Sequence, residues 1–328
     1  MHNSDLRLFV IGTSAGGYAA LRQILESIDP GIHAAFAVVI HSAYDAPAHF
    51  ADMLKNKISL NVLNAKQDLE IQPGNVYFSI PDMHLIVENS KLLLSKGPRE
   101  NLFRPAIDVL FRSAAVSYGN RCVGILLTGR LNDGSAGLEA IKKCGGMAIV
   151  QNPDTAAYRG MPSSAVQTAE VDYILDIADM PAIIQDLIHK PLPGKKKIPD
   201  NIRRENEICL QIGSHIQAED NLGSRVPLSC ATCGGPLWKM DDTAITRYRC
   251  HVGHSFTEKA LLSGQDQALE RALWVSLRTL EEKRIVLNKL AEQNIEGKAG
   301  LVSKSFSHKA DEVSQHIKAL RRIMKIED

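Results

Sequence analysis

Residues 9–17 read Phe-Val-Ile-Gly-Thr-Ser-Ala-Gly-Gly, an apolar run followed by a turn of small residues. The apolar run predicts a buried strand, and the sequence from Tyr18 onward predicts a helix. Gly12-x-Ser14-x-Gly16 has the spacing of a nucleophile elbow, in which glycines permit a sharp turn between strand and helix. Ser14 would then stand at the end of the strand with its hydroxyl exposed. The N-terminus of the following helix can stabilise negative charge on an attacked carbonyl.

Other glycine-rich turns fit this stretch less well. A dinucleotide-binding loop has glycine at the position of Ser14 and an acidic residue after the next strand, whereas here the next strand, 36–40, runs into His41. No Gly-Lys-Ser/Thr follows the glycines, which excludes a P-loop. A tight turn with Ser14 as a helix cap is an open alternative when the turn is considered alone.

The composition indicates an ordinary globular protein. The 328 residues allow one sizeable α/β domain and smaller additions. A net charge of +1 argues against general binding of nucleic acid. The sequence shows neither a signal-peptide pattern nor a membrane span, and six cysteines in a chain of this length do not form a disulfide framework. We therefore expect a cytoplasmic protein that does not insert into membranes.

Strand and helix patterns alternate through the first part of the chain, which predicts a doubly wound, mostly parallel α/β sheet. An antiparallel patch is expected where three short strands follow one another, at 76–80, 84–88 and 91–95. The other expected strands are 6–11, 36–40, 122–127, 147–150 and 173–175, and the expected helices are 18–28, 47–55, 105–118, 135–144 and 181–189.

Composition divides the chain into four parts: an α/β domain at 1–190, a linker at 191–225, a cysteine- and histidine-containing module at 226–262, and a helical region at 263–328. In the last part, apolar residues recur at helical spacing over 265–293 and 303–326, which predicts an antiparallel helical hairpin. Trp274 beside this stripe is expected to be buried. The stripes could pack on each other, on the module, or on a second subunit, so a homodimer through these helices is one option.

Three polar residues follow predicted parallel strands, where the loops of a doubly wound sheet meet. Ser14 follows the first strand, His41 the second, and Asp133 the apolar strand at 122–127. A serine hydroxyl needs an imidazole to accept its proton and a carboxylate to orient that imidazole, so the three residues predict a catalytic triad. Taken singly, His41 could serve only the backbone, and Asp133 could be a turn or helix-cap residue. His49, His84 and Asp108 are weaker candidates.

Five segments together resemble the catalytic domain of chemotaxis receptor methylesterases, the CheB family. They are Val10–Gly17, Val39-Ile-His41, Phe103–Phe111, Leu126–Gly137 and Met161-Pro-Ser-Ser-Ala165. The resemblance implies hydrolysis of glutamate methyl esters on the cytoplasmic helices of chemoreceptors, and deamidation of glutamine in some members. It makes Ser14 the nucleophile, His41 the general base and Asp133 the acid. It also places Thr13, Ala15 and Met161 near the substrate, with the Ala15 amide as an oxyanion donor.

The sequence departs from this family in two respects. Members commonly have Met-Gly after the Leu-Thr-Gly of the aspartate loop, where this chain has Arg130-Leu131. Arg130 could contact an acidic receptor helix, although we expect it to face solvent. Well-studied members also begin with a phosphoacceptor receiver domain, whereas this sequence begins at the catalytic strand. Control by another chemosensory protein, or a constantly open site, is then expected.

Cys230-x-x-Cys233 and Cys250-x-x-x-His254 are two ligand pairs separated by sixteen residues. This spacing predicts a tetrahedral structural zinc site, and His251 is an alternative fourth ligand. The segment around Leu237-Trp238 and 248–254, with the helix that follows, resembles a zinc-ribbon and helix appendage found after some stand-alone methylesterase domains. Four protein ligands leave no position for a reactive water, so zinc would be structural and the chemistry would need no cofactor.

The sequence therefore predicts a serine hydrolase that acts on a protein methyl ester, with methylated chemoreceptors as partners and no nucleic acid. Two other functions are alternatives. One is a catalytically silent docking protein of a chemosensory pathway, against which the presence of all three triad residues argues. The other is a hydrolase of small esters or amides.

Overall fold

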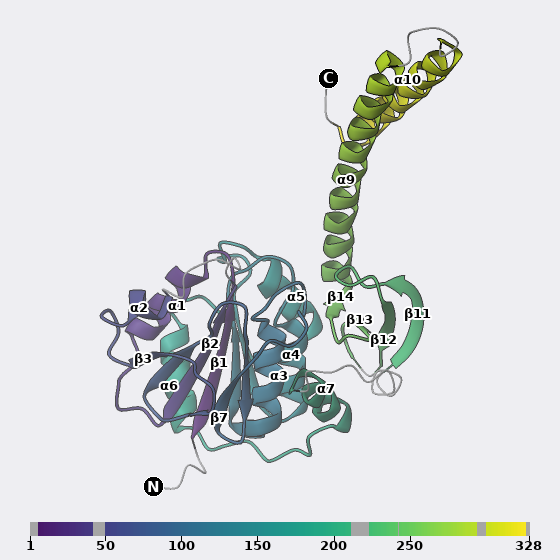
Figure 1. The fold of residues 1–328 in the computed structure, drawn as a ribbon. Coiled ribbons are helices and arrows are strands. Elements are labelled where there is room, and N and C mark those ends of the chain that lie inside the picture. The colour runs from purple at the N-terminus through teal and green to yellow at the C-terminus, as the bar shows by residue number, and fades with distance from the viewer. Residues whose placement is uncertain (1–5, 42–49, 211–222, 242, 294–299, 326–328) are drawn as a thin grey trace. The chain divides into compact units, whose positions relative to one another are not determined.

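A computed structural model describes residues 6–41, 50–210, 223–241, 243–293 and 300–325. The chain divides into two compact units, Met1–Leu261 and Leu262–Asp328. The centre of the first unit is a seven-stranded sheet in the order β10-β9-β8-β1-β2-β5-β3, in which every pair is parallel (Figure 1). Its strands are β1 (Arg7–Thr13), β2 (Ala34–Ile40), β3 (Asn61–Asn64), β5 (Asn75–Phe78), β8 (Cys122–Leu126), β9 (Met147–Gln151) and β10 (Tyr173–Leu175).

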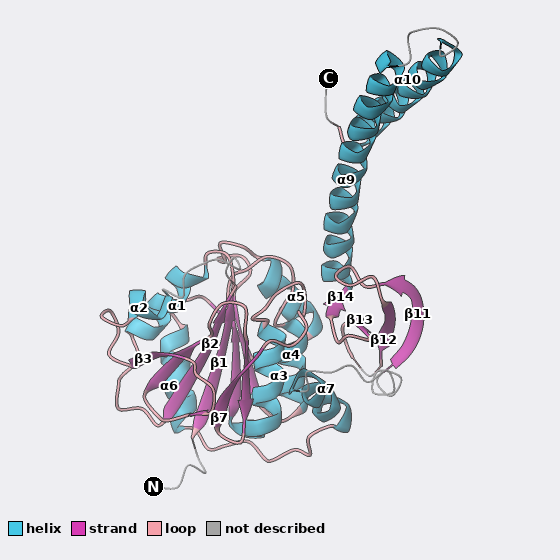
Figure 2. Ribbon diagram, viewed as in Figure 1, coloured by secondary structure: helices cyan, strands magenta, loops and turns pink. Residues whose placement is uncertain are grey.

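Helices cover both faces of this sheet, as Figure 2 shows. Side chains alternate along β1, so that Leu8 and Val10 enter one apolar core while Phe9 and Ile11 enter the other. The first core also contains residues of α3 (Ile107–Tyr118), α4 (Ser135–Lys143) and α5 (Gly160–Thr168). The second contains residues of α1 (Gly17–Glu26), α2 (Phe50–Leu54) and α6 (Met180–His189). The predicted doubly wound fold is confirmed.

The register of the sheet brings three strand ends together. Thr13 at the end of β1 pairs with Ile40 of β2, and Gly12 pairs with Leu126 of β8. The loops after β1, β2 and β8 therefore leave the same edge of the sheet side by side, with the β1 loop in the middle.

The expected antiparallel patch is only partly correct. A separate sheet, in the order β4-β7-β6, is antiparallel and contains β4 (Leu69–Glu70), β6 (His84–Glu88) and β7 (Lys91–Ser95). The strand predicted at 76–80 instead belongs to the main sheet as β5, in parallel register with β2 and β3. All four residues of β5 are buried, which suits a strand inside a covered parallel sheet. Of the predicted helix at 47–55, residues 47–49 lie outside the described residues, as does His49.

The predicted linker contains a helix, α7 (Asp200–Leu210), so the prediction was wrong over these residues. Apolar periodicity does not reveal α7, because two of its most buried side chains are Glu205 and Asn206. The helix packs against α3 and is fixed by ion pairs. These contacts make α7 part of the first unit.

A second antiparallel sheet follows, in the order β11-β12-β13-β14, and we call it the ribbon. Its strands are β11 (Gly223–Ser229), β12 (Pro236–Met240), β13 (Arg247–Cys250) and β14 (Ser255–Thr257). The ribbon has a small core of its own, formed by Cys230, Leu237, Cys250, Phe256, Ala260 and Leu261. It belongs to the same compact unit as the parallel sheet.

A buried charged cluster joins the ribbon to the helices of the parallel sheet. Glu205 of α7 contacts Arg247 and Arg249 of β13 at 2.7 and 2.8 Å, and Arg112 of α3 at 3.1 Å. Glu100 contacts Arg112 at 2.8 Å and Arg249 at 3.0 Å. Burial opposes the charge of Glu205, but the three surrounding guanidinium groups hold its pKa well below the ordinary value. Removing one partner would leave an uncompensated buried charge.

The second unit is formed by most of α9 (Glu258–Gln293) and by α10 (Gly300–Ile323). The predicted stripes pack against each other, with a core of Leu277, Leu287, Ala310, Val313 and Ile317. Arg321 contacts Glu281 at 2.9 Å and the Ser303 hydroxyl reaches the Ala291 carbonyl, as an antiparallel hairpin requires. Trp274 is 50% exposed, because its position lies outside this stripe, so the expectation that it is buried was wrong. No described helix is both long and apolar enough to cross a membrane.

Candidate active site

Ser14 lies in a sharp turn between β1 and α1. Its amide donates a hydrogen bond to the Thr128 carbonyl after β8 (3.0 Å), and its carbonyl accepts from the Gly17 amide. Gly16 has a φ of +76°, which strongly favours glycine, and this explains the second glycine of the elbow. The N-cap of α1 is Gly16, without a side-chain capping bond. Ser14 is therefore not the N-cap of α1.

Of the residues expected near the substrate, two lie close to Ser14 and one has another role. A Cβ added to Gly129 would lie 2.9 Å from the Ser14 Cβ and 2.1 Å from the Met161 sulfur, so Met161 of α5 and Ser14 flank Gly129. Ala15 directly follows Ser14, and its carbonyl accepts from the Thr128 hydroxyl. The Thr13 side chain is fully buried and donates to the Thr128 carbonyl at 3.0 Å. Thr13 thus stabilises the loop through its buried hydroxyl.

His41 lies beside the serine turn, since its amide donates to the Thr13 carbonyl at 3.0 Å. Its ring nitrogen Nε2 is 2.8 Å from the Asp133 Oδ2 atom. The other ring nitrogen, Nδ1, is buried and has no hydrogen-bond partner among the described residues. The ring also stacks on Phe103, with centroids 3.7 Å apart and 9° between the planes. The imidazole is thus fixed on one side and has one nitrogen available to accept a proton.

Asp133 is fully buried and accepts four hydrogen bonds. They come from His41 Nε2 (2.8 Å), the amides of Ile107 (2.7 Å) and Asp108 (3.2 Å), and Asn101 Nδ2 (2.8 Å). Burial alone would favour the neutral acid, but His41 and the surrounding donors lower the pKa of Asp133. The two amides belong to the first turn of α3, where a helix favours negative charge. Asp133 is therefore held ionised in one orientation.

Asp108 is the second carboxyl group of this region. It accepts hydrogen bonds from the amides of Gly134 (3.0 Å) and Gly137 (2.6 Å) at the start of α4, and from Asn101 Nδ2 (2.7 Å). Burial, together with the negative charge of Asp133, raises the pKa of Asp108 well above its ordinary value. The pKa of Asp108 is thus raised and that of Asp133 lowered, although the side-chain amide of Asn101 donates to both carboxyl groups.

Arg130 is exposed, as expected, and its guanidinium group lies over the Tyr158 ring, 5.0 Å from the centroid. Leu131 has a φ of +61°, in the left-handed region that favours glycine. The family that this sequence resembles commonly has glycine at this position. This chain has leucine there, in a strained backbone conformation.

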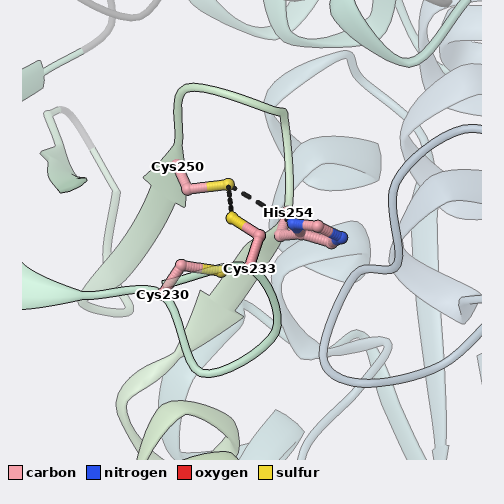
Figure 3. Close-up of side chains that lie close together, drawn as sticks. All are labelled: Cys230, Cys233, Cys250 and His254. Atoms are coloured by element: carbon pink, nitrogen blue, oxygen red, sulfur yellow. Dashed lines mark hydrogen bonds between the residues drawn. The ribbon is translucent and has the colours of Figure 1, made fainter. Parts of the chain in front are cut away.

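The residues predicted as metal ligands lie together in the ribbon (Figure 3). The ligand atoms of Cys230, Cys233, Cys250 and His254 are all within 4.8 Å of one another. The sulfurs of Cys233 and Cys250 are 3.7 Å apart, and the Cys250 sulfur is 3.4 Å from His254 Nδ1. Tetrahedral zinc with ordinary bond lengths separates two sulfurs by about 3.8 Å and a sulfur from a nitrogen by about 3.6 Å. These donors therefore fit zinc, and the group includes His254 and not His251.

Comparison with known proteins identifies the family of this chain. The family described as CheB methylesterase matches residues 9–184, which include Ser14, His41 and Asp133. The chain belongs to the CheB methylesterase family.

Several named relatives and one solved structure match the same region. A Leptospira interrogans protein, provisionally named protein-glutamate methylesterase/protein-glutamine glutaminase, is 37% identical over 51% of this chain and 88% of its own length. An Escherichia coli protein named protein-glutamate methylesterase/protein-glutamine glutaminase is 31% identical over 58% of this chain and 55% of its own length. The crystal structure of the Thermotoga maritima CheB methylesterase catalytic domain is 31% identical, with a TM-score of 0.52, over 55% of this chain and 98% of that one. The chain thus spans about half the length of several of its CheB relatives.

Two residues that contact the candidate triad were not identified from the sequence. Asn101 contacts both carboxyl groups, and Phe103 stacks on His41, yet both lie in a segment without periodicity. Phe103 occurs in one of the segments that resemble the family, which was the only signal for it. Nothing in the sequence around Asn101 indicates its contacts.

Proposed function

We propose that this chain hydrolyses glutamate methyl esters of chemoreceptors, with Ser14, His41 and Asp133 as the catalytic triad. One observation carries the proposal: His41, whose backbone amide bonds to the serine turn, is fixed to ionised Asp133 through Nε2 and has no partner for Nδ1 among the described residues. A histidine with only a structural role would not need a buried ring nitrogen without a partner. Family membership makes a methyl ester of a protein glutamate the expected substrate.

The proposed reaction follows the chemistry of serine hydrolases. The Ser14 oxygen attacks the ester carbonyl while His41 Nδ1 takes its proton, and Asp133 stabilises the imidazolium. The amide of Ala15 stabilises the oxyanion. His41 then protonates the departing methoxy group, so that methanol leaves and an acyl-enzyme forms. Water then attacks the acyl-enzyme with His41 again as base. The glutamate side chain of the receptor is released from the enzyme, and His41 returns a proton to Ser14. With a glutamine side chain, ammonia would leave in place of methanol.

A structural zinc ion in the ribbon, held by three cysteines and one histidine, is a second part of the proposal. Two of the ligand–ligand distances match tetrahedral zinc, and all four ligand atoms lie within 4.8 Å of one another, which supports it. Zinc would stabilise the ribbon and take no part in ester hydrolysis. A substrate on the cytoplasmic helices of receptors would also place the protein in the cytoplasm.

The test is the release of methanol from a chemoreceptor cytoplasmic fragment carrying tritiated methyl esters, with the wild-type protein and a Ser14→Ala variant. We expect release by the wild type only. Release that persists in the variant would show that Ser14 is not the nucleophile. If the wild type hydrolyses p-nitrophenyl acetate and never the receptor, the protein is a small-ester hydrolase. If it hydrolyses neither, it is a docking protein with an inactive site.

A further inference from the structure

A tight turn at residues 100–103 supplies side chains to the catalytic region. The Glu100 amide donates to the Phe103 carbonyl at 3.2 Å, and the Phe103 amide donates to the Glu100 carbonyl at 2.9 Å. The two central residues, Asn101 and Leu102, have φ values of +51° and +75°. Leucine rarely adopts such a conformation, so surrounding contacts must maintain this turn.

The turn holds the catalytic acid and the catalytic base at the same time. Asn101 Nδ2 donates to Asp133 Oδ1 at 2.8 Å, on the carboxylate oxygen that does not face His41. Phe103, two residues later, stacks on the His41 ring. A shift of this turn would therefore move the partners of both members of the His41–Asp133 pair.

Strand β14 of the ribbon fixes the turn from its other side. The backbone carbonyl of Ser255 accepts a hydrogen bond from the backbone amide of Asn101 at 2.8 Å, and the backbone amide of Thr257 donates to Asn101 Oδ1 at 3.0 Å. The Asn101 side chain thus links β14 directly to Asp133. The Thr257 hydroxyl donates to Asn132 Oδ1 at 2.8 Å, immediately before Asp133. Asn101, Asn132 and Thr257 are all at most 3% exposed, so water does not compete for these bonds.

The ribbon contacts the other two residues of the turn as well. Leu102 packs against the apolar core of the ribbon. The Glu100 carboxylate pairs with Arg249 of β13, whose side chain also donates to the Gly253 carbonyl within the ribbon. The ribbon therefore contacts Glu100, Asn101 and Leu102, and it is the partner that can maintain the strained backbone.

We propose that the ribbon is a positioning element of the active site, acting through the 100–103 turn and Asn132. Asn101 and Thr257 are positioning residues: Asn101 orients Asp133, and Thr257 orients Asn101 and Asn132. The inference rests on the proposed function, since it concerns the same His41–Asp133 pair. Any signal that loosens β14 would then reach the catalytic acid and base without contacting the substrate.

The experiment compares Asn101→Gly, Thr257→Val and Thr257→Ser. Glycine keeps the left-handed backbone of residue 101 and removes only its amide side chain. Thr257→Ser keeps the hydroxyl that Thr257→Val removes. Thr243→Val is the matched control, because it removes another ribbon hydrogen bond, to the Ile245 carbonyl, away from the turn. Circular dichroism and thermal unfolding of each variant establish that it is folded.

Two readouts are used. The first is the proton NMR resonance of the His41 Nε2–H···Asp133 hydrogen bond, assigned with a His41→Gln variant. The second is kcat and KM for methyl-ester hydrolysis. In Asn101→Gly and Thr257→Val we expect the resonance to shift or broaden and kcat to fall roughly tenfold, with KM unchanged. Thr257→Ser and Thr243→Val should match the wild type in both.

An unchanged resonance and unchanged kcat in folded Asn101→Gly and Thr257→Val would overturn the proposal. Equal effects in Thr243→Val would also overturn it, because the ribbon would then act only through general stability. The NMR readout does not require turnover. Absence of esterase activity in the wild type would therefore count against the proposed function, while the resonance still decides whether the ribbon positions the pair.

Discussion

Asp133 stabilises the start of α3, the helix that contains Asp108, and Asp108 stabilises the start of α4, which begins two residues after Asp133. Asp133 accepts hydrogen bonds from the first two amides of α3, and Asp108 of α3 accepts them from amides at the start of α4. The exchange locks α3 and α4 together at the edge of the sheet where Ser14 and His41 lie. It also explains how a fully buried carboxylate can be kept ionised: peptide dipoles and His41 offset its burial.

The raised pKa of Asp108 predicts a pH-dependent stability. The folded-state pKa of Asp108 lies above its unfolded value, so the folded protein favours the protonated carboxyl group. The free energy of unfolding therefore falls as the pH rises from about 4 through the folded pKa. Asp108→Asn cannot ionise and avoids this loss. We expect the variant to be less stable than the wild type at pH 4 and the deficit to shrink by pH 7.5, measured by urea unfolding. A constant deficit at both values would contradict the assignment.

Asp133→Asn tests the role of the carboxylate. The substitution keeps the size of the side chain, but an amide nitrogen facing His41 cannot accept its Nε2 proton and favours the wrong tautomer. We expect kcat to fall about 10³- to 10⁴-fold. Loss of charge at the start of α3 should also reduce the free energy of unfolding. A variant with less than a tenfold loss of kcat would show that Asp133 has only a structural role.

The buried charged cluster should dominate the attachment of the ribbon. Glu205→Gln leaves Arg112 and Arg249 with the Glu100 carboxylate alone, and it removes the ion pair of the buried Arg247. We expect the free energy of unfolding to fall by about 3–5 kcal/mol, as for other buried pairs that lose one partner. Glu26→Gln is the control, since the Arg22–Glu26 pair is exposed and should contribute little to stability. Equal effects of the two substitutions in urea unfolding would be incompatible with this account.

Zinc content tests the ribbon assignment. We expect about one zinc ion per chain by elemental analysis of purified protein, and a lower unfolding temperature after chelation. Cys250→Ser and His254→Ala should lose the metal, whereas Cys144→Ala, a buried cysteine of the parallel-sheet part, should retain it. Folded wild-type protein that carries no zinc and is insensitive to a chelator would remove the assignment.

The sequence was sufficient to predict the doubly wound sheet, because the buried parallel strands are continuous apolar runs such as 36–40. It also identified Ser14, His41 and Asp133 as residues that follow neighbouring strands. It could not predict α7, whose most buried side chains include Glu205 and Asn206, or the assignment of β5 to the parallel sheet. Asn101 was missed because its importance comes from contacts with Asp133 and Thr257, which lie 32 and 156 residues away.

The most direct measurement of the central claim is mass-spectrometric mapping of the adduct formed with a fluorophosphonate, which labels serines activated by a neighbouring base. The account predicts a single adduct on Ser14 of the wild type, none in Ser14→Ala, and labelling slowed by at least about a hundredfold in His41→Gln. An adduct on another residue, or equal labelling of Ser14 in His41→Gln, would contradict the proposal that His41 activates Ser14.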